Sequence, residues 1–74
     1  MTTLTKQDKL QIISSHIRNL EYRKYGLELD IIVEEAKTTP VSEVISKHQE
    51  ALDEINNQMA ALNTELAAIN ALTE

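Results

Sequence analysis

Two histidines and twelve carboxylates are the side chains in this sequence best suited to chemistry, and cysteine is absent. The carboxylates that stand close together along the chain are Glu34, Glu35, Glu50, Asp53 and Glu54. Carboxylates inside a helical bundle can hold a metal ion, usually together with a His that follows a Glu by three residues. Neither His16 nor His48 has a Glu at that spacing. We therefore expect these carboxylates to form a solvated acidic face, with no metal ion and no other cofactor.

The sequence has no pattern for nucleophilic or phosphate chemistry. Without cysteine there is no thiolate, and no serine stands in the G-x-S-x-G pattern that exposes a nucleophile on a tight turn. A phosphate-binding loop needs several glycines, and Gly26 is the only one. The two histidines are too few and too far apart for a standard zinc motif. We predict that the chain is not an enzyme and has no catalytic residue.

A hydrophobic repeat in the second half of the chain predicts one of the helices that position these side chains. Its members, spaced alternately four and three residues apart, are Val41, Ile45, His48, Leu52, Ile55, Met59, Leu62, Leu66, Ile69 and Thr73. A repeat of this kind is typical of a coiled-coil seam, and it predicts one helix over about residues 40–72. His48 is interpreted either as a partly buried polar core residue or as a pH-sensitive layer.

The first half of the chain carries the same repeat, interrupted once by a charge at Lys24 and followed after Ile31 by Glu34. Its members are Leu10, Ile13, Ile17, Leu20, Lys24, Leu27, Ile31 and Glu34. Thr5 followed by Asp8 resembles a capping box, so we predict a helix over about residues 6–37. Gly26, with the alternating pattern of residues 27–31 after it, leaves a break or a strand as the alternative to a continuous helix.

We place the turn between the two helices at residues 38–39. Pro40 lacks an N–H and suits the first position of the second helix, with Thr39 as the N-cap. So short a connection makes neighbouring helices antiparallel. The predicted fold class is all-α, with the whole chain forming one antiparallel two-helix coiled-coil hairpin. Antiparallel coiled coils place a positions opposite d positions. In the register of this kind nearest to the turn, the residue numbers of each opposed pair add to 79, so Lys24 lies opposite Ile55.

This hairpin leaves a second apolar stripe on the first helix without a neighbouring helix to cover it. The interface residues that we assign to it, with one valine past the turn, are Tyr22, Tyr25, Leu29, Ile32, Val33, Ala36 and Val44. At about 100° per residue the stripe lies roughly 140° around the helix from the seam, so one neighbouring helix cannot cover both. We expect a homodimer that buries the stripe in a four-helix bundle and acts as a structural scaffold or accessory protein. The alternative is a small regulatory binder that docks the stripe on a partner protein.

Two further patterns on the second helix can each be interpreted in two ways. Amide residues recur every seventh position beside the seam, at Gln49, Asn56, Asn63 and Asn70. They form either a plain polar flank or a ladder that sets the orientation of a partner. Alanines lie away from the seam, at Ala60, Ala61, Ala67, Ala68 and Ala71. They reflect either high helix propensity or the close approach of another helix.

The net charge of −5 is divided unevenly along the chain. Residues 1–25 carry +3 and residues 26–74 carry −8, which we interpret as regions that complement each other within or between chains. An acidic chain whose only aromatic residues are two tyrosines is poorly suited to bind nucleic acid. No apolar run approaches the ~18 residues of a membrane span, and the first residues do not resemble a signal peptide. We expect a cytoplasmic protein that binds neither nucleic acid nor membrane.

Two segments, with the tail that follows them, carry a resemblance to known proteins. The segments are Leu4-Thr-Lys-Gln-Asp-Lys-Leu and Asn19-Leu-Glu-Tyr-Arg-Lys-Tyr-Gly-Leu-Glu-Leu, and the tail is an acidic heptad sequence rich in Ile, Ala and Leu. They are similar to small uncharacterised proteins of marine cyanobacterial phages. The resemblance implies a phage-encoded, short helical protein with an accessory or virion-associated role, located in the host cytoplasm or the virion. It implies no activity for any individual residue.

Overall fold

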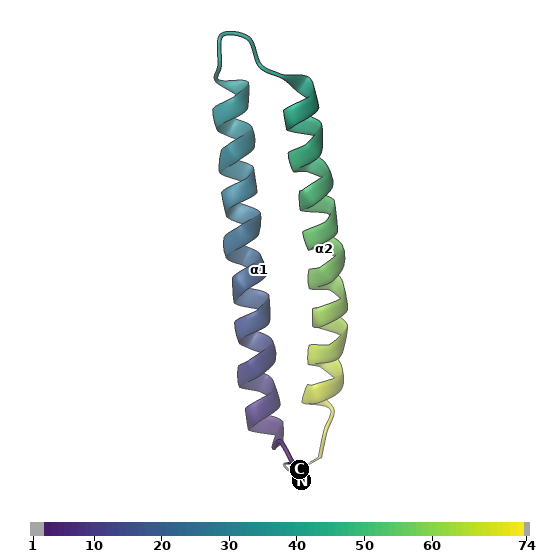
Figure 1. The fold of residues 1–74 in the computed structure, drawn as a ribbon. Helices are drawn as coiled ribbons and strands as arrows, with labels where there is room; N and C mark the ends of the chain where they lie inside the picture. The colour runs from purple at the N-terminus through teal and green to yellow at the C-terminus, as the bar shows by residue number, and fades with distance from the viewer. Residues whose placement is uncertain (1–2, 74) are drawn as a thin grey trace.

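The computed structural model describes residues 3–73, which form two long helices packed side by side as an antiparallel hairpin (Figure 1). Helix α1 spans Lys6–Glu35 and helix α2 spans Ser42–Asn70. The molecule measures 57 × 20 × 15 Å, with the turn at one end and the start of α1 beside the end of α2 at the other (Figure 1). The predicted all-α class and the antiparallel hairpin are confirmed.

The start of α1 is fixed by the capping box that the sequence predicted. The Asp8 N–H donates to Thr5 Oγ1 at 3.1 Å, and the Thr5 N–H donates back to Asp8 Oδ2 at 3.1 Å. Two backbone donors of the first turn are thereby satisfied, and the Asp8 charge lies at the positive end of the helix dipole.

Gly26 lies inside α1, and the helix continues through it without a break. The strand that we considered for residues 27–31 is wrong, because these residues are helical. The seam residues Leu27 and Ile31 pack on the helix side that faces α2, so burial at the helical period decides the conformation.

Replacing Gly26 by alanine is expected to stabilise the hairpin by about 1 kcal/mol, because Ala is the better helix former by that amount. Apart from its chain neighbours and the backbone of its own helix, a Cβ atom at this position would meet no atom within 4 Å, so no clash offsets the gain. For a domain of this size the melting temperature should rise by roughly 4–8 °C. Thermal unfolding followed by circular dichroism measures the change. An unchanged or lower melting temperature would contradict a continuous, unobstructed helix at Gly26.

The core of the hairpin is the seam between the helices, and it follows the predicted repeat. The buried residues are Ile13, Leu20, Ile31, Glu34, Ile55 and Ile69. All six occupy predicted seam positions. The other seam residues are half-buried, except Val41 and Thr73, which lie at the two ends of the repeat and are exposed. The core is therefore a single row of side chains from each helix, and most of the surface of each helix is left uncovered.

The connection between the helices is longer than the sequence predicted. Residues 36–41 reverse the chain, whereas we placed the turn at residues 38–39. Helix α1 therefore ends two residues earlier than expected, and α2 is two residues shorter at each end, since it stops at Asn70. The physical reason at the turn is Pro40, which disfavours helical angles in the residue before it and so keeps the threonines out of both helices.

Glu34 provides the hydrogen bond at the start of α2 that the sequence assigned to Thr39. The N-cap position belongs to Val41, whose side chain makes no capping hydrogen bond. The Val41 N–H donates instead to Glu34 Oε2 at 3.0 Å, and Lys37 Nζ lies 2.9 Å from Glu34 Oε1. We call this arrangement the Glu34 clamp. It joins the end of α1 to the start of α2, where the helix dipole favours a negative charge.

The clamp makes the ionisation of Glu34 part of the stability of the hairpin. The Lys37 ammonium and then the Val41 N–H hold the pKa of Glu34 below its ordinary value of 4.5, and the charge of His48 adds to them against the effect of burial. Because the pKa is lower in the folded chain than in the unfolded one, the contribution is fully present above about pH 4.5. It is lost as the pH falls through the lowered pKa.

Glu34→Gln is therefore expected to lower the free energy of unfolding at neutral pH and to weaken its fall below pH 4.5. Glutamine keeps an acceptor for the Val41 N–H but removes the charge that pairs with Lys37. Urea unfolding at a series of pH values measures both effects. Glu35→Gln removes the same charge from the exposed neighbour and is the matched control. An identical pH dependence in the wild type and Glu34→Gln would show that the clamp does not stabilise the fold.

The open end of the hairpin is tied by Lys6. Its Nζ donates to the carbonyl oxygens of Asn70 at 3.1 Å and Leu72 at 3.2 Å, where α2 ends and its dipole is negative. The numbers of these paired residues add to 76 and 78, within one helical turn of the predicted sum of 79.

Neither helix, within residues 3–73, has the length and apolar content that crossing a membrane requires.

Candidate interaction surface

The second stripe lies on the face of α1 that turns away from the seam, and the hairpin leaves it uncovered. We define the Tyr stripe as Tyr22, Tyr25, Leu29, Ile32, Val33 and Ala36, all of which are exposed. Its five large side chains are between 42% and 64% exposed. Val44, which we had grouped with them, is half-buried in the first turn of α2. It therefore lies at the turn end of the hairpin and not on the stripe.

The size of the Tyr stripe sets it apart from scattered surface residues. A whole aromatic side chain presents ~150–250 Å², so the five large side chains together expose on the order of 500 Å². The largest apolar patch of a monomeric protein is typically ~300–600 Å² and is often functional. From Tyr22 to Ala36 the stripe runs for about 21 Å along the helix, or roughly four turns. These dimensions match the contact face of one docked helix.

Arg18 marks the end of the Tyr stripe that points toward the chain termini. The centre of its guanidinium group lies 4.9 Å from the Tyr22 ring centroid, within the range of a cation–π contact. Its Nη1 lies 3.9 Å from Glu21 Oε1, with both side chains largely in solvent. Arg18 thus covers one side of the Tyr22 ring. Beyond it, the same face of α1 carries polar residues.

One border of the Tyr stripe is a row of glutamates, and the other border carries no charge. When Tyr22 and Leu29 are taken as successive a positions, the g positions on one side are Glu21, Glu28 and Glu35. The e positions on the other side are Asn19, Gly26 and Val33. Each border lies about 70° from the centre of the stripe. We call the first set the glutamate row. Our sequence reasoning missed it because the heptad letters were assigned only to the seam.

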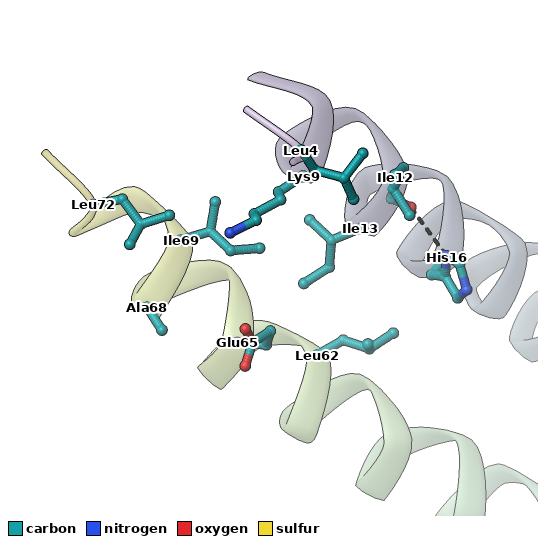
Figure 2. Close-up of a pocket in the computed structure, with 10 residues that line it drawn as sticks. All are labelled: Leu4, Lys9, Ile12, Ile13, His16, Leu62, Glu65, Ala68, Ile69 and Leu72. Carbon is teal, nitrogen blue, oxygen red and sulfur yellow. Dashed lines mark hydrogen bonds between the residues drawn. The ribbon is translucent and has the colours of Figure 1, made fainter. Parts of the chain in front are cut away.

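A second surface that the sequence reasoning missed is an apolar groove at the open end (Figure 2). Its exposed large apolar members are Leu4, Ile12 and Leu72, which lie outside the predicted repeat. The signal in the sequence was an apolar residue just before the N-cap, with Ile12 directly beside the seam residue Ile13. Neither fits a heptad, so a search by period passes over them.

The two histidines lie at opposite ends of the hairpin, His16 at the open end and His48 on the seam near the turn. His16 and Glu65 both line the open-end groove. His16 Nδ1, however, lies 3.0 Å from the Ile12 carbonyl oxygen (Figure 2). That oxygen can only accept, so Nδ1 carries the proton. His48 is half-buried on the seam, as predicted. Among residues 3–73, no three His, Asp or Glu side chains are grouped as metal ligands would be.

The comparisons with known proteins add no functional assignment to this geometry. No protein-family model, no curated protein and no solved structure matches the chain. The resemblance to phage proteins stays a prediction. Any statement about function therefore depends on the surfaces of the hairpin itself.

Proposed function

We propose that this chain is a non-enzymatic interaction protein that docks a helix of a partner protein on the Tyr stripe of α1. The observation that carries the proposal is the exposure of the stripe: five large apolar side chains are aligned at helical spacing, and each is between 42% and 64% exposed. A helix laid on such a stripe is a common mode of recognition, with anchors that recur every three or four residues. The hairpin serves as the rigid support that holds α1 straight.

The charge of the chain favours a foreign partner over a second copy. Each copy carries −5, so a pair carries −10 before any contact is made, and like charges oppose association. The glutamate row brings part of this charge to the border of the contact. A partner without this surplus of negative charge avoids the repulsion.

The homodimer is the second candidate, and the exposed area supports it. Two Tyr stripes packed together would bury about 1,000 Å² in total, which is near the lower limit for a specific interface. The resulting assembly of four helices would be the structural scaffold that we expected from the sequence. A hairpin with a single row of core side chains would also gain stability from the added burial.

The mass of the chain in solution separates the two candidates. Light scattering over a dilution series, with helicity followed by circular dichroism, is the first measurement. A helical monomer at every concentration supports the docking of a partner. A dimer that loses helix on dilution, and that becomes a monomer on Leu29→Glu substitution, would overturn the docking proposal in favour of the scaffold.

A further inference from the structure

The glutamate row gives the Tyr stripe a chemical preference for its partner. Glu21, Glu28 and Glu35 recur every seven residues, so they stand about 10 Å apart along one side of α1. All three are exposed. A helix docked on the stripe therefore covers the apolar centre and brings its own flank beside three carboxylates.

The hairpin itself leaves most of this negative charge uncompensated. Glu21 has a weak contact of 3.9 Å with Arg18. The other ion pairs among residues 3–73 join Lys37 to Glu34 and Lys47 to Glu43, so Glu28 and Glu35 take part in none. A docked helix would reduce the hydration of these carboxylates, which is unfavourable unless a cation faces them.

Packed stripe to stripe, a second copy of the chain would place no cation on the border that faces the glutamate row. If two α1 helices packed antiparallel, the g borders would face each other and the glutamate row would meet its own copy. If they packed parallel, the row would face the e border, which consists of Asn19, Gly26 and Val33. The outer face of α2 carries Glu43, Glu50 and Glu54 and offers only Lys47 in exchange.

We propose that the natural occupant of the Tyr stripe is an amphipathic helix with Lys or Arg residues along the flank that faces the glutamate row. This inference rests on the proposed function, since it names the chemistry of the partner that the same surface takes. The apolar side chains of the partner supply burial, and its basic flank sets the choice of partner and the orientation.

Three synthetic peptides test the inference on the full chain. Each has 21 residues with Leu and Ile at the a and d positions, and they differ only at e and g, which are all Lys, all Gln or all Glu. Binding to the chain is measured by calorimetry, at low salt and at about 1 M salt, where exposed charges are screened. We expect the Lys peptide to bind about tenfold more tightly than the Gln peptide at low salt, and the Glu peptide more weakly still.

Two triple variants with equal changes of net charge locate the effect. Glu21→Gln, Glu28→Gln and Glu35→Gln together remove the row, and the preference for the Lys peptide should fall about tenfold. Glu43→Gln, Glu50→Gln and Glu54→Gln remove the same charge from the outer face of α2, and the preference should persist. An equal loss in both variants would overturn the inference, because general attraction to an acidic protein would then explain it.

The outcomes distinguish the inference from the proposed function. If all three peptides bind equally well, the stripe docks helices but the glutamate row selects nothing, and only the inference fails. If none of them binds to a monomeric, helical chain, the docking function fails as well. If the chain is a dimer that excludes every peptide, the occupant is a second copy, and both proposals are overturned.

Discussion

Replacing Ile55 by alanine is expected to destabilise the hairpin by about 2–4 kcal/mol and to lower its melting temperature by more than about 10 °C. Ile55 is the most deeply buried side chain of the seam, with 2% of its surface exposed. A domain of this length has a total stability of only ~4–11 kcal/mol, so one cavity removes a large part of it. The higher helix propensity of alanine offsets a few tenths of a kcal/mol at most.

Ile32→Ala is the matched control for this prediction. The side chain lost is the same, but Ile32 is 59% exposed and belongs to the Tyr stripe. Because the hairpin does not cover it, the free energy of unfolding of the monomer should stay within about 0.5 kcal/mol of the wild-type value. A strong loss of stability in Ile32→Ala would mean that the stripe is covered by another chain under the conditions of the measurement. Similar values for the two variants would contradict the assignment of the core to the seam.

The seam was predictable from the sequence because each helix repeats its apolar residues at one period over its whole length. Burial follows that period closely: Ile13, Leu20, Ile55 and Ile69 are buried at their expected positions, and Lys24 is half-buried among them. The capping box was predictable for a similar reason, because its partners lie three residues apart in the sequence. Local spacing carries this information, so no knowledge of the fold was needed.

The turn could not be predicted in detail, because its main stabilising contact is not encoded by spacing. In the sequence Glu34 is only the charged position that follows the last apolar residue of the repeat, yet it is 6% exposed and accepts the Val41 N–H. Its role depends on how the chain closes over residues 36–41, which brings that backbone donor back to α1. The sequence also placed a cap at Thr39 from local preference, and a contact from the other helix replaced it.

The Tyr stripe was predictable from the spacing of its apolar residues. Its glutamate border was not, because it depends on assigning heptad letters to the stripe as well as to the seam. When the heptad letters are assigned from the seam residues, Glu21, Glu28 and Glu35 are an ordinary solvated flank. They become a border only when the exposed face of α1 is treated as a contact surface in its own right. The open-end groove shows the opposite case, since Leu4 and Ile12 belong to no period and only the packed helices bring them beside Leu72.

Leu29→Glu is expected to weaken binding of the Lys peptide at least 30-fold while leaving the hairpin folded. Leu29 lies at the middle of the Tyr stripe and is 42% exposed. A central apolar anchor typically contributes ~2 kcal/mol or more to a helix interface, and a carboxylate placed there would also have to be buried without a partner. Calorimetry gives the affinity, and circular dichroism on the same sample gives the helicity and melting temperature.

Leu4→Glu is the control, because Leu4 is 41% exposed and lines the groove at the open end, away from the stripe. It makes the same substitution at the same degree of exposure, so it should change neither helicity nor affinity for the peptide. Equal loss of binding in both variants would place the peptide outside the Tyr stripe. Loss of helix in Leu29→Glu alone would show instead that the stripe holds the chain together, as a homodimer requires. Retained helix with lost binding is the combination that only a docking surface explains.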